Sequence, residues 1–177
     1  MKGSRVAKRY ARALLEVAEH GEGEQWGAEL EKLARIVESP ELMPRLASPE
    51  LPQQAREQAM QKIAERLDLS FPLRSFAVVL ARHGRIAAIG AVSQSYQDLL
   101  DEQLGRERAT LTFAIQPDDG AVQRVVSGLE AIAGKKIIPT IKVDPALLGG
   151  VTAELGGKIY DGSLATRLVE AQHRLAG

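Results

Sequence analysis

The chain has 177 residues, of which 45% are hydrophobic and 26% charged, the balance of a globular protein that can bury a core. Lys plus Arg and Asp plus Glu each number 23, so the net charge of zero excludes a general electrostatic attraction to nucleic acid or anionic lipid. The chain contains no Cys, which excludes disulfides, thiol catalysis and Cys-ligated metal sites, and no stretch approaches the roughly 20 apolar residues that span a bilayer.

The first part of the chain is predicted to be helical, because its apolar residues recur at helical spacing. The predicted helices cover residues 6–18, 24–38, 53–67, 72–83 and 86–104. The four prolines from Pro40 to Pro52 predict short turns and loop between the second and third of them. Pro72 suits the first turn of its helix, and Gly84 suits the end of the same helix. We therefore expect residues 1–105 to form a compact helical bundle.

Each of these helices is expected to bury one apolar stripe. Aromatic residues make up only 4% of the chain, so the core should consist mainly of Ala, Leu, Val and Ile. The predicted stripes are Tyr10, Leu14 and Val17 or Ala18; then Trp26, Leu30, Leu33 and Val37; then Ala55, Ala59, Ile63 and Leu67; and finally Leu73, Phe76, Ala77 and Leu80.

After Gly105 the periodicity changes to that of a small α/β domain, which we expect over residues 106–177. Strands are predicted at 109–115, 137–143, 151–155 and 158–160, with a helix at 120–133 that presents Val122, Val125, Val126, Leu129 and Ile132. Gly156 and Gly157 suit the tight turn of a hairpin between the last two strands. Asp161 or Ser163 should cap a final helix to about Leu175. The predicted fold class is α+β.

No catalytic or cofactor site can be assembled from the sequence. His20, His83 and His173 are scattered, without a second ligand at metal-binding spacing. The segment 128–136 resembles a phosphate loop only superficially, because Leu129 stands where a Gly is required. We therefore predict no enzyme activity, no metal and no cofactor.

Two helices carry more apolar residues than a single core stripe requires. In the first helix, Val6, Ala13 and Val17 lie beside the core stripe, and in helix 72–83 the residues Val78 and Val79 are left over. The first helix is therefore either the central helix of its own bundle or the site of a second contact. A groove between these two helices could accept an amphipathic helix from another protein.

Five motifs, taken in order along nearly the whole chain, resemble those of the delta subunit of bacterial F-type ATP synthases, whose mitochondrial counterpart is the oligomycin-sensitivity-conferral protein. They are Val6–Leu14, His83–Ile86, Asp144–Pro145, Leu148–Val151 and Asp161–Ser163. Each motif is weak alone, but their joint order and spacing are specific to that family.

The resemblance implies a non-catalytic stator subunit that links the catalytic head to the peripheral stalk. An N-terminal six-helix bundle would bind the N-terminal helix of an alpha subunit, and the C-terminal domain would hold the end of the b-type stalk. The protein would lie peripherally at the cytoplasmic face of the bacterial inner membrane. The implied alpha-binding groove contains Tyr10, Ala13 and Val79, with Arg9, Val17, Ser75 and Arg82 as neighbours.

Three alternatives to this function are open at the level of sequence. The basic run from Lys2 to Arg12 would suit a helical RNA-binding or transcription-factor module, but the charge is balanced in both halves of the chain. The same run, with no acid before Glu16, is also compatible with an organelle presequence. A small-molecule enzyme has no named site to support it.

Overall fold

The computed structural model describes residues 2–18, 21–147 and 149–161. The chain divides into two compact units, Met1–Leu100 and Asp101–Gly177, and each is described by itself. The division falls within a helix, a few residues before Gly105, where the sequence periodicity changes.

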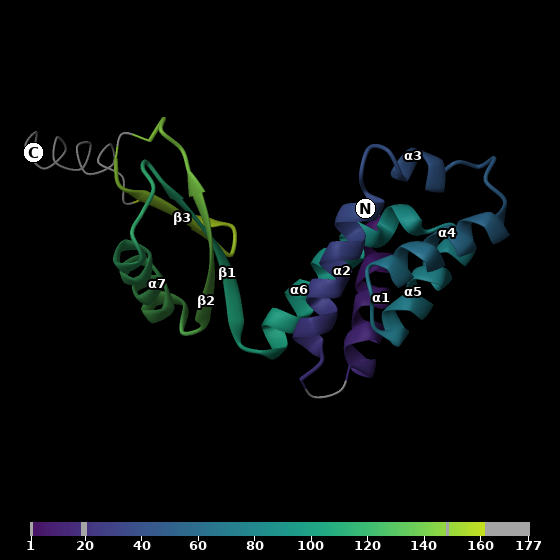
Figure 1. The fold of residues 1–177 in the computed structure, drawn as a ribbon. Helices are drawn as coiled ribbons and strands as arrows, with labels where there is room; N and C mark the ends of the chain where they lie inside the picture. Colours follow the sequence, from purple (N-terminus) through teal and green to yellow (C-terminus); the bar gives the residue numbers. More distant parts are fainter. Residues whose placement is uncertain (1, 19–20, 148, 162–177) are drawn as a thin grey trace, which may run out of the picture. The chain divides into compact units, whose positions relative to one another are not determined.

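The helical unit contains most of the described helices (Figure 1). Its described helices are α1 (Lys2–Val17), α2 (Gly23–Val37), α3 (Met43–Leu46), α4 (Gln53–Arg66), α5 (Phe71–Arg82), the 3-10 helix η1 (Ile86–Ala88) and α6 (Ile89–Gln103). The helix expected at 86–104 is thus divided into η1 and α6, and α3 is a single turn of four residues among the prolines. The described residues of the bundle thus form five longer helices and two short ones, α3 and η1, so the expected six-helix bundle is matched only in outline. Together with the sheet of the second unit, they confirm the α+β class.

The core of the helical unit confirms two of the predicted stripes and confirms the other two in part. The stripes of α2 and α5 are buried as expected. In α1 the core positions are Ala7, Ala11 and Leu14, whereas Val17 is 64% exposed. In α4, Met60 and Ala64 are buried, and Ala59, Ile63 and Leu67 of the predicted stripe are half-buried against the core. The core stripe of α1 cannot be recognised from the hydrophobicity pattern, because two of its residues are alanines and the pattern gives more weight to Tyr and Val than to Ala. Since α1 supplies core residues, the segment is part of the fold of the helical unit.

The sole tryptophan and a buried tyrosine mark this core. Trp26 is 3% exposed, and Tyr96 on α6 is fully buried, with its hydroxyl donating to the Gly23 carbonyl at 3.1 Å. A Cβ at Gly23 would lie 2.9 Å from the Leu100 side chain, so α2 and α6 approach closely there. Burial, followed by the charge of Glu22, raises the pKa of Tyr96 to about 12.

The second unit is a four-stranded mixed sheet with a helix on one face (Figure 1). Its elements are β1 (Arg106–Phe113), α7 (Asp119–Ala133), β2 (Lys136–Val143), β3 (Val151–Leu155) and β4 (Lys158–Asp161), in the sheet order β2-β1-β3-β4. β1 pairs in parallel with β2 and antiparallel with β3, so the α7 segment is the crossover of a βαβ unit. β3 and β4 form the predicted hairpin, and Gly156 and Gly157 have φ of 56° and 76° in its turn.

Local sequence signals explain the ends of α7. The Asp118 side chain accepts a hydrogen bond from the Ala121 N–H at 2.6 Å, and Gly134 follows the helix with a φ of 66°. Val126 and Leu129 of α7 pack on Leu111 and Ala153 of the sheet. Two expectations were wrong, because Ile115 lies beyond β1 at 77% exposure and Ile132 is 63% exposed.

Asp161 is the last residue of β4, and the helix predicted after it lies outside the described residues.

An ion-pair cluster ties the end of α6 to the start of β1. Asp101 is 5% exposed and lies 3.2 Å from the Arg106 guanidinium, and Arg108 Nε donates to its second carboxylate oxygen. A buried carboxylate requires such partners, since leaving it unpaired is strongly destabilising. Asp101 is therefore held beside the start of β1.

Candidate functional site

The described part of the chain offers surfaces for contact and no assembled catalytic centre. Among the described residues, no group of three or more His, Cys, Asp or Glu side chains could hold a metal ion. His83 is exposed at the end of α5, and His20 and His173 lie outside the described residues. No described helix combines the length and apolar character that crossing a bilayer requires.

The residues predicted for helix binding lie on two neighbouring helices. Arg9, Tyr10, Ala13 and Val17 belong to α1, and Ser75, Val79 and Arg82 belong to α5. Figure 1 shows α1 beside α5 in the helical unit, and the Tyr10 ring meets the Phe76 ring edge-on at a centroid distance of 5.7 Å. We call the seven predicted residues the α1/α5 surface.

Tyr10 joins the two helices at the base of this surface. Its ring is half-buried against the core, and its hydroxyl accepts a hydrogen bond of 2.8 Å from Arg85 Nη1. The Arg85 guanidinium also lies 5.8 Å from the centre of the Tyr10 ring, within range of a cation–π contact. Tyr10 is therefore held from two sides, which fixes α1 against α5 and the turn that follows α5.

The other members of the α1/α5 surface differ in how free they are. Arg9, Ala13, Val17 and Ser75 are exposed, and Val79 is half-buried. Arg82 instead forms two hydrogen bonds with Glu57 on α4, of 3.2 and 3.3 Å, and the hydrogen bond from Arg82 lowers the pKa of Glu57. The charge of Arg82 is thus already engaged, whereas small or apolar side chains remain open.

The sequence prediction missed one exposed aromatic residue on the same helix. Phe71 is 81% exposed at the start of α5, one turn before Ser75. The sequence places Phe71 just before Pro72, where a helix is expected to begin, but it does not indicate that the Phe71 side chain is exposed. Phe71, Ser75 and Val79 stand one turn apart on the same face of α5, so Phe71 lies in line with the candidate surface.

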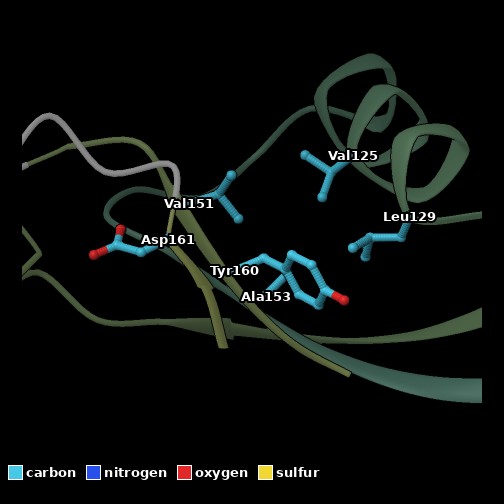
Figure 2. Close-up of a pocket in the computed structure, with 6 residues that line it drawn as sticks. All are labelled: Val125, Leu129, Val151, Ala153, Tyr160 and Asp161. Carbon is cyan, nitrogen blue, oxygen red and sulfur yellow. The ribbon is translucent and has the colours of Figure 1, made fainter. Parts of the chain in front are cut away.

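The second unit has an apolar hollow of about 320 Å³ between α7 and the β3–β4 hairpin. It is lined by Val125, Leu129, Val151, Ala153, Tyr160 and Asp161. In Figure 2 the side chains of Val125 and Leu129 point from α7 toward the strands, and the Tyr160 ring lies below them. No partner-binding residue of this unit can be named from the sequence, because the hollow forms only when the hairpin packs on the helix.

The chain is similar to known proteins over nearly its whole length. Residues 6–175 match the family ATP synthase delta (OSCP) subunit. The chain is 36% identical to ATP synthase subunit delta of Syntrophobacter fumaroxidans over 177 residues, which cover 99% of this chain and 97% of that protein. It is 33% identical to ATP synthase subunit delta of Geobacter sp. strain M21, with 97% of each chain covered.

A solved structure has the same fold. A chain in a cryo-EM structure of the Toxoplasma gondii mitochondrial ATP synthase hexamer superposes with a TM-score of 0.67, covering 97% of both chains at 22% identity. At this identity the likeness concerns the fold alone.

Proposed function

This chain belongs to the ATP synthase delta (OSCP) subunit family and is a non-catalytic stator subunit of ATP synthase, and we propose that its two units bind different parts of that enzyme. The helical unit binds the N-terminal helix of an alpha subunit on the α1/α5 surface. The second unit holds the end of the b-type peripheral stalk. The family assignment leaves the alternatives of an RNA-binding or transcription-factor module and of a small-molecule enzyme without support.

The observation that carries the first contact is the exposure of small and apolar side chains beside Tyr10. Ala13 and Val17 are exposed on α1, and Val79 is half-buried on α5. The apolar face of an amphipathic helix could cover these side chains and gain their burial, at roughly 25 cal/mol for each Å² of apolar surface. Tyr10 and its partners keep the two helices in place, so little ordering cost remains on this side of the contact.

The apolar hollow supports the second contact. Val125, Val151 and Tyr160 are half-buried around the hollow and offer apolar surface to a partner of the second unit, and the end of a stalk helix is the partner that we propose. The protein is a peripheral part of the complex, and we propose that it lies at the cytoplasmic face of a bacterial inner membrane.

Attachment at two ends suits the task of a stator. Rotation of the central shaft exerts torque on the catalytic head, and a static link must stop the head from turning with it. The link requires slow dissociation, and two tethered contacts provide it because a released end rebinds at high effective concentration. The protein therefore contributes to ATP synthesis by holding its partners and not by chemistry of its own.

Titration of a peptide tests the first contact. The probe is the first twenty or so residues of the cognate alpha subunit, and the variants are Val79→Asp and Ala13→Leu in the full chain. Val79→Asp buries an unpaired charge under the peptide, and a loss of about 3 kcal/mol weakens binding roughly a hundredfold. Ala13→Leu should obstruct the bound helix and weaken binding in the same direction.

The matched control is Ile36→Asp, which places the same charge at another partly exposed aliphatic residue, 41% exposed on α2. We expect it to bind the peptide as wild type does, and melting curves identify any variant that fails to fold. Wild-type affinity in folded Val79→Asp and Ala13→Leu variants would show that the alpha helix binds elsewhere.

A further inference from the structure

Four cations form one stripe along the exposed side of α1. Arg5, Lys8, Arg9 and Arg12 stand at positions i, i+3, i+4 and i+7, the spacing that places side chains on the same helix face. All four side chains are exposed. We call them the basic stripe.

No ion pair neutralises the basic stripe within the described part of the chain. A shallow hollow of about 380 Å³ runs along it, lined by the four cations with Ala13 and Glu16. Glu16, the only carboxylate in that lining, stands at one end of the stripe. Positive charge therefore dominates the remaining length of the hollow.

The basic stripe borders the apolar part of the α1/α5 surface. Ala13 lies one turn after Arg9 and belongs to the lining of the same hollow, and Val17 follows one turn later. On α5, Arg82 already forms its ion pair with Glu57. The positive charge without an ion-pair partner among the described residues thus lies on the α1 edge of the surface. At the α5 edge the charge of Arg82 is neutralised by Glu57.

We propose that the basic stripe selects and orients the partner helix by pairing with a row of carboxylates along one edge of that helix. The occupant is an amphipathic helix whose apolar face covers Ala13, Val17 and Val79 and whose Asp or Glu side chains recur each turn beside that face. Carboxylates one turn apart match cations one turn apart, because both helices rise about 5.4 Å per turn. This inference rests on the proposed alpha-subunit contact and specifies the chemistry of the helix that it accepts.

Charges at the rim of a contact act mainly on association and on choice of partner. Opposite charges at the rims of the two partners speed their association and disfavour a helix bound in the wrong orientation. The apolar contacts, in contrast, limit the rate of dissociation. Salt should therefore slow the association of this helix and leave its dissociation nearly unchanged.

The test measures binding rates of the alpha-subunit peptide to the full chain at about 50 and 500 mM salt, about 13 and 4 Å in Debye length. The variant is Arg5→Gln, Arg9→Gln and Arg12→Gln combined. The control combines Arg45→Gln, Lys62→Gln and Arg66→Gln, which remove the same charge from exposed positions on α3 and α4. We expect the stripe variant to associate about tenfold more slowly at low salt and to lose most of its salt dependence. The control should match the wild type.

The outcomes separate this inference from the proposed function. If the stripe variant keeps the wild-type rate and salt dependence while Val79→Asp abolishes binding, the alpha contact stands and the stripe is not its selector. If the wild-type chain does not bind the peptide at either salt concentration, both proposals are wrong. A further experiment measures the binding of wild type and the stripe variant to vesicles of phosphatidylglycerol. Vesicle binding that only the stripe variant loses, with unchanged peptide rates, would assign the stripe to a membrane surface and overturn the inference.

Discussion

Glu29 on α2 supplies a hydrogen-bond acceptor at the start of α5, and its replacement should loosen the helix that carries half of the α1/α5 surface. The residue is 8% exposed, and its carboxylate accepts hydrogen bonds from the Ser70 N–H at 2.7 Å and from Gln25 Nε2 at 2.8 Å. Ser70 is the N-cap residue of α5 and makes no side-chain cap bond of its own. The negative charge also lies where the helix dipole favours it.

The size of the effect follows from these contacts. Burial raises the pKa of Glu29, but the hydrogen bonds from Ser70 and Gln25 outweigh it, so the pKa lies below its ordinary value of 4.5. Hydrogen bonds to a charged group contribute about 1.5–3 kcal/mol, so Glu29→Ala should lower the free energy of unfolding by about 2 kcal/mol. Glu29→Gln keeps an acceptor oxygen and should lose only about 1 kcal/mol. The matched control is Glu31→Gln on the same helix, whose ion pair with Arg35 is exposed and worth less than about 0.5 kcal/mol.

Tryptophan fluorescence measures the result in the right part of the molecule, because the sole tryptophan, Trp26, is buried in the helical unit. A loss of 2 kcal/mol lowers the melting temperature of a unit of this size by about 8–16 °C. Because the folded pKa of Glu29 is lowered, its contribution is complete above pH 4.5 and disappears as the pH falls through the lower folded value. The difference between wild type and Glu29→Gln should therefore shrink in acid. Equal stability of wild type and Glu29→Ala at pH 7 would refute the reasoning.

Further predictions concern the core and the division of the chain. Tyr10→Phe removes the acceptor of the Arg85 hydrogen bond and should lower the free energy of unfolding in urea by about 1 kcal/mol. Tyr10→Ala also removes the ring that packs on Phe76 and should lower it by about 2–3 kcal/mol. Equal losses in the two variants would contradict the role given to the ring. Burial raises the pKa of Tyr96 to about 12, so the free energy of unfolding should fall between pH 10 and 12 as the hydroxyl of the unfolded chain ionises. Tyr96→Phe has no such group and should lose less stability over this range. Parallel pH profiles of the two proteins would show that Tyr96 is not the cause of the loss. A fragment of residues 1–105 should give a cooperative helical melt by circular dichroism, and an unfolded fragment would mean that the two units depend on each other.

The class of the fold and the positions of most of its elements could be predicted from the sequence. Pro72, Asp118 and Gly134 mark the ends of helices by local chemistry, and the structure shows the corresponding helix ends at α5 and α7. Burial was harder to predict. Ala7 and Ala11 are core residues with little hydrophobicity, and Met60 lies among polar neighbours, so packing in three dimensions decides what is buried there.

The candidate site shows a similar limit. An excess of apolar residues on two helices could be recognised, because periodicity shows which residues a core stripe does not require. The partners of these residues could not be predicted, since Arg82 meets Glu57 and Tyr10 meets Arg85 only after distant segments fold together. Hydrogen bonds between residues far apart in the chain have no signature in a single sequence.

The place of β1 in the sheet bears on how the second unit carries a mechanical load. If the helical unit binds the head as proposed, tension from α6 reaches β1 directly after Leu104 and Gly105. β1 is an inner strand with eight residue pairs to β2 and five to β3. A pull along such a strand loads its hydrogen bonds in shear, so many must break together, whereas an edge strand can be peeled away one bond at a time. Under the attachment proposed for the two units, the force thus enters the sheet at its most extensively paired strand.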